Sequence, residues 1–285
     1  MISDTRLQHL LNSDTTIVFT FGYTGAGKST LILGLYEYLF KHHRVRLNPN
    51  GNREGAKYIS TCAKALRKDR KLPEVTTINT VYEIDWLSEL DSSESIFTFL
   101  DIAGENFRTV DFTEEVSGKT NPGELDEIPK KYLQKEGSQL PIILLCVLDC
   151  ERVDEQDFFI NTFLNYAQTY NFSFLAAAVI VTKWDNKPEN HSQVEAFLKT
   201  KAHQTCINLE HYVENLRFFP FSIGTINQAD PQIVDTIDFS YCHDILKWLH
   251  QVSENKPMFD TNETNTLDFL KFVFESIKSF PLVFK

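Results

Sequence analysis

Short apolar runs alternate with longer stretches of helical spacing along most of the chain. Six runs have the length and residue types of strands: Thr15–Phe21, Thr80–Trp86, Ile96–Leu100, Ile142–Leu148, Leu175–Val181 and Phe218–Phe221. Five stretches predict helices: Thr30–Lys41, Arg53–Asp69, Asp154–Tyr170, Gln193–His203 and His243–Gln251. Strands that alternate with helices are typical of a largely parallel sheet covered on both faces. We therefore predict an α/β three-layer sandwich around a mixed, mostly parallel six-stranded sheet with one antiparallel edge strand, a position that suits the weakly alternating Thr80–Trp86.

Two polar stretches interrupt this order and are interpreted as insertions, one at about 43–72 and one at about 113–137. Near the end of the chain, the polar segment Ser253–Asn265 precedes an apolar stretch of helical spacing, Leu267–Lys278. We predict one domain over residues 1–252, and over 253–285 a linker and a helix that packs on the domain or on a partner.

Composition narrows the functional classes. The chain has 285 residues, of which 42% are hydrophobic, enough to bury a core. Its longest apolar runs have the length of strands, so we expect no membrane span. The net charge of −11 argues against a general nucleic-acid binder, which needs a basic surface. An N-terminus without the apolar stretch of a signal peptide, and five scattered cysteines, favour a cytoplasmic protein.

The first strand runs directly into Gly22-Tyr23-Thr24-Gly25-Ala26-Gly27-Lys28-Ser29, which matches the phosphate-binding pattern GxxxxGK[ST]. Glycines allow the backbone to wrap a triphosphate closely, and the N-terminus of the following helix adds partial positive charge. Lys28 is expected to reach the β- and γ-phosphates, and the Ser29 hydroxyl to bind Mg²⁺. We assign these eight residues and Thr30 to nucleotide binding.

An acidic residue ends the strand Ile96–Leu100, in the sequence Asp101-Ile102-Ala103-Gly104. An Asp at the tip of a buried strand beside a phosphate loop can hold Mg²⁺, usually through a water. The backbone N–H of Gly104 is free to approach a γ-phosphate. We therefore predict Asp101 as a magnesium residue and Gly104 as part of the catalytic apparatus.

Thr182-Lys183-Trp184-Asp185 follows the strand Leu175–Val181 and supplies a third motif, [NT]KxD. A phosphate loop, DxxG and [NT]KxD in this order resemble the Ras-like, translation-factor-related P-loop GTPases, over about Thr15–Gln251. The resemblance implies a P-loop NTPase (G-domain) fold with GTP, GDP and Mg²⁺ as ligands. It also implies that Asp185 accepts hydrogen bonds from guanine N1–H and the 2-amino group, and that the Lys183 stem lies over the base.

The resemblance implies two further positions. Ser222-Ile223 stands where the family has a Ser-Ala motif whose backbone N–H meets guanine O6, although Ile replaces the usual small residue. A switch threonine that binds Mg²⁺ only in the triphosphate state is expected before DxxG, and Thr76, Thr77 and Thr80 are candidates. The spacing Pro73-Glu74-Val75-Thr76 is similar to the Pro-x-x-Thr pattern of some bacterial members, including double-GTPases, and favours Thr76.

Positive charge is concentrated just before these threonines: residues 41–72 hold ten Lys/Arg and two Asp/Glu. A solvated helix face is the simplest interpretation. An acidic partner surface is an alternative, and so is an arginine that meets developing phosphate charge, for which Arg67 and Arg70 are the candidates.

These residues together predict a GTP-binding protein that hydrolyses GTP slowly with Mg²⁺ and acts as a nucleotide-dependent switch. We expect a protein effector or activating partner, with a homodimer as a further option. Two alternatives stay open. A P-loop ATPase or kinase would also use Asp101, but Thr182–Asp185 argues against it, and a non-hydrolysing scaffold would hold its nucleotide without turnover.

Glu105 generates a prediction about rate, because Ras-type relatives have a water-orienting glutamine at this position. A carboxylate cannot donate a hydrogen bond, so Glu105 cannot hold both the attacking water and a phosphate oxygen as an amide can. We expect isolated turnover no faster than the unassisted Ras-type rate, roughly 10⁻⁴ to 10⁻³ per second. Single-turnover GTP hydrolysis should be compared with that of Glu105→Gln. A hydrolysis rate of the purified chain about a thousand times above this range would contradict the prediction. An unchanged hydrolysis rate in Glu105→Gln would exclude a role for Glu105.

Overall fold

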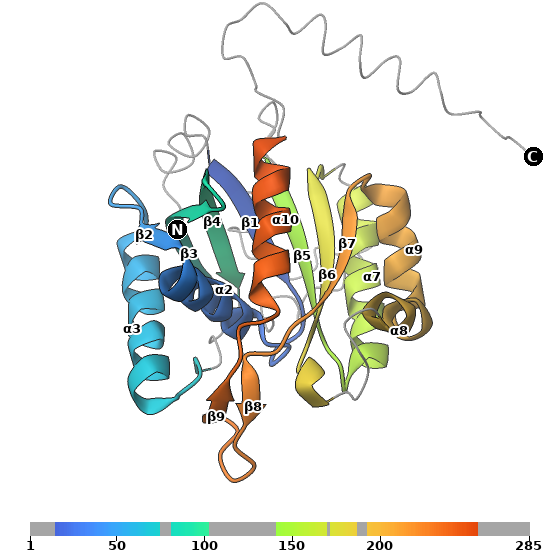
Figure 1. Ribbon diagram of the computed structural model, residues 1–285. Coiled ribbons are helices and arrows are strands. Elements are labelled where there is room, and N and C mark those ends of the chain that lie inside the picture. The colour runs from blue at the N-terminus through green and yellow to red at the C-terminus, as the bar shows by residue number, and fades with distance from the viewer. Residues whose placement is uncertain (1–14, 75–80, 103–140, 170–171, 187–192, 256–285) are drawn as a thin grey trace, which may run out of the picture. The chain divides into compact units, whose positions relative to one another are not determined.

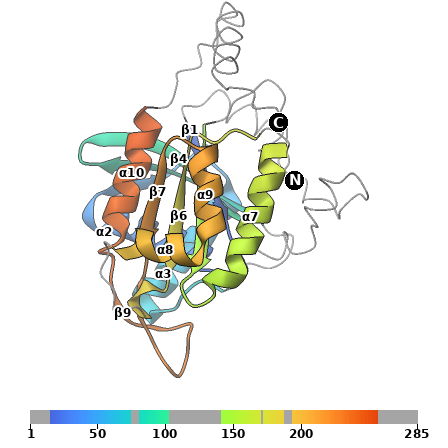
Figure 2. The same ribbon diagram turned by 90° about the vertical axis from the view of Figure 1, so that its right-hand side faces the viewer.

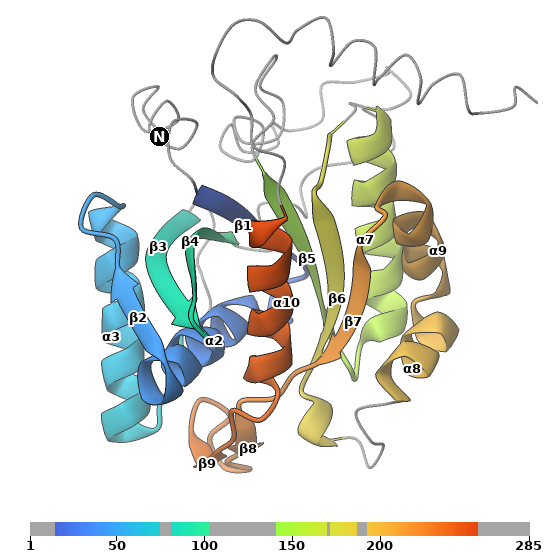
Figure 3. The same ribbon diagram turned by 45° about the horizontal axis from the view of Figure 1, so that its top comes forward.

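A computed structural model describes residues 15–74, 81–102, 141–169, 172–186 and 193–255. Its centre is a seven-stranded sheet in the order β2-β3-β4-β1-β5-β6-β7, which can be followed across Figure 3. The strands are β1 (Thr15–Phe21), β2 (Arg44–Leu47), β3 (Val81–Leu90), β4 (Ser93–Ile102), β5 (Ile142–Asp149), β6 (Ala176–Thr182) and β7 (Leu216–Pro220). The predicted α/β class and mostly parallel sheet are confirmed.

The number of strands and the position of the antiparallel strand were predicted wrongly. β4, β1, β5, β6 and β7 are parallel, and β3 pairs antiparallel with β4 as expected. However, β3 is not an edge strand, because the short β2 pairs along its other side from Arg44↔Glu89 to Leu47↔Trp86. The four residues of β2 lie within the basic stretch, where alternating arginines concealed a strand.

Helices cover both faces of the sheet, as Figures 1 and 2 show. α2 (Lys28–His42), α3 (Arg53–Asp69) and α10 (Cys242–Glu254) belong to one buried cluster. α7 (Val153–Thr169), α8 (Val194–Lys201) and α9 (His203–Tyr212) belong to the other. The side chains of β1 alternate between the two, with Ile17, Phe19 and Phe21 in one cluster and Val18 in the other. This period of two builds the three predicted layers.

Most predicted helices are confirmed, and α3 has the predicted bounds. The stretch Gln193–His203 is an exception, because a helix ends at Lys201 and a new one, α9, begins at His203. The sequence interpretation also missed a hairpin after β7, made of β8 (Gly224–Ile226) and β9 (Val234–Ile237). The stretches at 113–137 and 256–285, with the expected helix Leu267–Lys278, lie outside the described residues.

α3 is held against the sheet at its beginning by backbone contact. A Cβ on Gly55 would come within 1.8 Å of the Glu83 carbonyl oxygen, so no larger residue fits at this approach. Asn52 caps the helix by accepting hydrogen bonds from Glu54 N and Gly55 N. The Asn52 N–H donates in turn to buried Asp85, at 2.7 Å. Together these contacts fix where α3 starts relative to β3.

Farther along, one ion pair joins α3 to α2. The Arg67 guanidinium donates to both carboxylate oxygens of Glu37, with Nη2–Oε1 at 2.7 Å and Nε–Oε2 at 2.8 Å. It also lies over the Phe40 ring, 3.8 Å from the centroid. Glu37 is 5% exposed, so its charge depends on this partner for compensation.

Arg67→Ala should therefore destabilise the chain without changing nucleotide turnover. Since Glu37 would be left buried without its guanidinium, we expect a loss of about 1–3 kcal/mol in the free energy of unfolding. Denaturant unfolding should be compared with that of Lys64→Ala, a change on an exposed position of the same helix, for which we expect less than about 0.5 kcal/mol. Equal stability of the two variants would contradict the structural role of the pair.

Candidate nucleotide site

The phosphate loop, Gly22–Ser29, joins β1 to α2 at the carboxyl edge of the parallel strands. Two of its glycines need left-handed backbone, with φ of 77° at Gly25 and 89° at Gly27. Gly22 is required for a different reason, because a Cβ there would lie 2.3 Å from the Val147 carbonyl oxygen of β5. The loop is thus pressed against the neighbouring strand and then turns into α2, whose first backbone N–H groups have no intrahelical acceptor.

The Lys28 ammonium is held inside this loop. Nζ donates to the carbonyl oxygens of Gly22 at 2.9 Å and Tyr23 at 3.1 Å, and the residue is 6% exposed. A buried ammonium that meets carbonyl oxygens of its own loop presents concentrated positive charge at the start of α2. An anion at this helix terminus would be stabilised both by Lys28 and by the helix dipole.

Thr182 connects the phosphate loop to the end of β6. Its hydroxyl donates to the Ala26 carbonyl oxygen at 2.7 Å and also lies 3.1 Å from the Leu148 carbonyl oxygen. A Cβ on Gly27 would come within 3.3 Å of the Thr182 methyl group, so the loop has little room to shift. The first residue of the [NT]KxD motif therefore fixes the loop.

The other two motif residues, Lys183 and Asp185, contact different partners. Lys183 has a φ of 57°, and its ammonium pairs with buried Asp149 at 2.5 Å. Asp185 lies in a short 3₁₀ helix, Trp184–Asn186, and accepts a hydrogen bond from the Ser222 hydroxyl at 2.6 Å. The Ser222 hydroxyl is itself an acceptor for Gly224 N, at 3.0 Å. This chain of bonds orients the Asp185 carboxylate.

Residues from all three assigned segments line one cavity of about 530 Å³. We call it the central cavity, and its volume lies within the range typical of small-molecule sites. The predicted binding residues that line it are Thr24, Gly25, Gly27, Lys28, Ser29, Thr30, Thr182, Lys183, Asp185, Ser222 and Ile223. Gly22, Tyr23 and Ala26 were also predicted to bind nucleotide but are not among the lining residues. Tyr23 instead packs edge-on against Phe159, with ring centroids 5.3 Å apart.

Asp101, the predicted magnesium residue, is fully buried near the end of β4. The Tyr58 hydroxyl of α3 donates to its Oδ2 at 3.3 Å. The next residue, Ile102, lines the cavity, whereas Asp101 does not. The described residues contain no group of three or more His, Cys, Asp or Glu that could hold a metal. Hydroxyl and carboxylate oxygens such as those of Ser29 and Asp101 are donors that suit Mg²⁺.

Several predicted catalytic residues cannot be placed. Thr76, Gly104 and Glu105, with the competing Thr77 and Thr80, lie outside the described residues. Of the arginine candidates, Arg67 binds Glu37 of α2. Arg70 ends α3 with a left-handed backbone, at a φ of 58°.

The sequence interpretation missed part of the cavity wall. This part consists of Leu72, Pro73 and Glu74 after α3, and of Thr225, Ile226, Gln228, Pro231 and Gln232 in the hairpin. The Asp230-Pro231 pair is typical of a turn and could have indicated a hairpin. Its place beside the site depends on tertiary packing and had no sequence signal.

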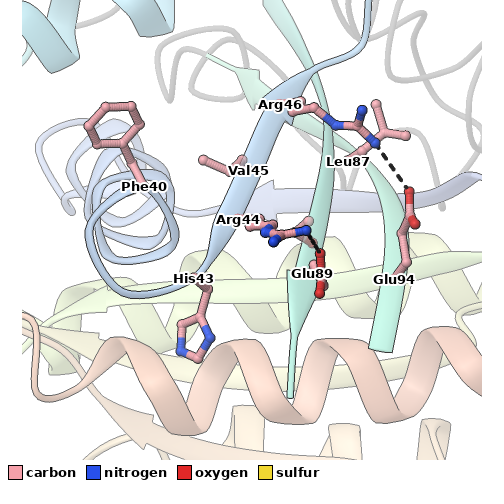
Figure 4. A pocket seen from close by; sticks show the side chains of 9 residues that line it. Phe40, His43, Arg44, Val45, Arg46, Leu87, Glu89 and Glu94 are labelled. Carbon is pink, nitrogen blue, oxygen red and sulfur yellow. Dashed lines mark hydrogen bonds and ion pairs between the residues drawn. The ribbon is translucent and has the colours of Figure 1, made fainter. Parts of the chain in front are cut away.

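A second hollow, of about 470 Å³, lies along β2 and the end of α2. Its charged side chains are already paired, as Figure 4 shows: Arg44 with Glu89 at 3.4 Å and Arg46 with Glu94 at 3.7 Å. None of the predicted site residues line it. The central cavity is therefore the candidate nucleotide site.

Comparisons with known proteins give distant structural similarity. No protein-family model matches the sequence, and no curated protein matches it. The chain is similar to a Methanosarcina barkeri Roco2 structure (RocCORdC) bound to GDP, at 15% identity and a TM-score of 0.40, covering 84% of this chain and 49% of that one. It is also similar to the S. cerevisiae Ski7 GTPase-like domain bound to GTP, at 15% identity and a TM-score of 0.46, covering 91% and 54%. The chain thus spans about half the length of these structures.

None of the helices in the described part of the chain is long and apolar enough to cross a membrane.

The Thr182 hydroxyl generates a prediction about affinity. Thr182→Val keeps the shape of the side chain but leaves the Ala26 carbonyl oxygen without this donor, so the phosphate loop loses its tie to β6. We expect nucleotide affinity to fall about tenfold, measured by calorimetry. Thr20→Val is the matched control, because it removes a buried hydroxyl that donates to the Leu100 carbonyl oxygen at 2.5 Å and does not line the cavity. Equal affinity losses in both variants would mean that Thr182 acts only through stability.

Proposed function

We propose that this chain binds GTP and GDP, hydrolyses GTP slowly with Mg²⁺, and acts as a nucleotide-dependent switch. One observation carries the proposal: the phosphate loop, Thr182–Asp185 and Ser222–Ile223 come from three distant parts of the sequence and line the same cavity. A cavity with a helix N-terminus and a lysine on one side, and an oriented carboxylate on the other, suits a nucleotide bound across it.

Preference for guanine over adenine rests on Asp185. Guanine presents two adjacent donors, N1–H and the 2-amino group, and adenine presents neither in this arrangement. The Ser222 hydrogen bond to Oδ1 holds the carboxylate in one orientation while leaving lone pairs for a base. A bound adenine would leave this carboxylate without its donors, which disfavours ATP. The backbone N–H of Ile223 is proposed to meet guanine O6.

At the phosphate end, Lys28 is proposed to bind the β- and γ-phosphates, and the loop N–H groups to surround them. Ser29, Asp101 and Thr76 would hold Mg²⁺, with Asp101 acting through a water. Mg²⁺ held by these residues would neutralise negative charge on the phosphates. Gly104 would donate its N–H to the γ-phosphate, and Thr76 and Gly104 would be ordered differently with GTP and with GDP.

The Lys183 stem is proposed to lie over the base, while its ammonium pairs with buried Asp149. We propose that this pair fixes the turn carrying Asp185. Slow turnover, with Glu105 after DxxG, implies an effector or activating partner, or a second copy of the chain. We propose a cytoplasmic setting. We do not propose nucleic acid as a partner.

Asp185→Asn tests base recognition. The substitution turns one carboxylate acceptor into a donor, which suits the 2-oxo group of xanthine better than the 2-amino group of guanine. We expect GTP affinity to fall at least about a hundredfold while affinity for xanthosine triphosphate rises. Competition calorimetry with GTP, xanthosine triphosphate and ATP measures this.

Asp154→Asn, an equivalent change on the exposed surface of α7, is the control and should leave all three affinities unchanged. A variant Asp185→Asn that keeps its preference for GTP would place the base elsewhere. Wild-type chain that prefers ATP would overturn the proposed guanine specificity.

A further inference from the structure

Two segments about 160 residues apart meet at one end of the central cavity. Arg70–Leu72, which follows α3, pairs with Gln232–Val234, which leads into β9. Leu72 N donates to the Gln232 carbonyl oxygen at 2.8 Å, and Val234 N donates to the Arg70 carbonyl oxygen at 2.9 Å. Lys71 and Ile233 face each other as an antiparallel pair between these bonds. We call this pairing the ribbon.

The ribbon, Pro73 beside it and the hairpin together contribute an apolar wall to the cavity. Leu72 and Pro73 line it from one segment, and Ile226 and Pro231 from the hairpin. Gln228 and Gln232 add amide side chains, which can both donate and accept hydrogen bonds. An apolar wall with a few polar groups suits the faces and edges of a nucleoside better than it suits phosphate.

The hairpin is attached to the base end of the site rather than to the phosphate end. β8 starts at Gly224, two residues after Ser222, which bonds both Gly224 and Asp185. At Gly224 the backbone φ is 128°, and a Cβ would lie 1.8 Å from the Thr236 carbonyl oxygen. The root of the hairpin is therefore fixed next to the carboxylate proposed to read guanine.

We propose that the ribbon, with Pro73 and the hairpin beside it, completes a nucleoside subsite, in which Leu72, Pro73, Ile226 and Pro231 enclose the base and ribose of the bound nucleotide. This inference rests on the proposed function, since it takes the occupant to be a nucleotide. The two backbone hydrogen bonds of the ribbon hold its halves together around the nucleoside. Separating them would open that end of the cavity.

A reversible crosslink tests the subsite. Lys71 and Ile233 form a non-hydrogen-bonded antiparallel pair, the geometry with the shortest Cα separation, about 4.5 Å, which a disulfide can bridge. In the variant Lys71→Cys/Ile233→Cys, oxidation should slow release of bound GDP about tenfold or more, and reduction should restore it. The probe is radiolabelled GDP followed by filter binding, because a fluorophore on the ribose would occupy the proposed subsite.

Lys71→Ser/Ile233→Ser, treated with the same oxidant, controls for the substitutions and for the native cysteines. Val234→Pro gives the opposite perturbation, because it removes the N–H that donates to Arg70, whereas Val234→Ala keeps it. We expect Val234→Pro to release GDP about tenfold faster than Val234→Ala. If Val234→Pro fails to fold, the crosslinked variant decides the question alone.

The outcomes separate this inference from the proposed function. If the wild-type chain binds GDP but the crosslink leaves GDP release from the double-cysteine variant unchanged, the subsite is overturned and the proposed function stays intact. If the wild-type chain prefers ADP to GDP and the crosslink slows ADP release from the double-cysteine variant, the subsite is supported and guanine specificity is overturned. Failure to bind any nucleoside diphosphate would contradict both.

Discussion

The hydrogen bond from the Thr182 hydroxyl to the Ala26 carbonyl oxygen joins the two halves of the candidate site. The phosphate loop has little side-chain mass of its own, and its glycines give it conformational freedom that must be removed for a site to exist. Contact with the Val147 carbonyl on one side and with Thr182 on the other removes it. Because Thr182 also starts the turn that carries Asp185, the distance between the phosphate end and the base end is set by this one residue.

The other polar contacts of the site follow from that constraint. Past Thr182 the chain leaves β6, and the left-handed Lys183 turns it so that its ammonium reaches Asp149 at the end of β5. Ser222, just past β7, then bonds Asp185. Each bond joins the carboxyl ends of neighbouring parallel strands, which is where open α/β sheets place their ligands. The rigid sheet thus positions a site made almost wholly of turns.

Sequence alone could predict those parts of the fold that depend on local pattern. The buried strands β1, β5 and β6 are continuous apolar runs, and the glycine pattern fixed the phosphate loop between β1 and α2. The sequence alone could not predict β2, because its alternating arginines hide the pairing with β3. Nor could it predict the hairpin β8–β9 beside the site, because that position depends on pairing with a segment about 160 residues away. Ser222 and Asp185 were found by motif, but their hydrogen bond is a tertiary fact. Leu72 and Ile226 carry no motif, so their place in the cavity wall could be learned only from the structure.

The basic segment, residues 41–72, shows that positive charge concentrated in the sequence does not have to gather at the candidate site. One of its two candidate arginines, Arg67, compensates buried Glu37 and so holds α3 to α2. Lys57, Lys64 and Lys68 lie exposed on α3 and form no ion pair among the described residues. What links this helix to the central cavity is the backbone just after it, since the carbonyl of Arg70, the C-cap residue of α3, accepts the hydrogen bond from Val234. In the described residues, the segment therefore acts on the site by fixing the position of one wall, and the charges of Lys57, Lys64 and Lys68 face solvent.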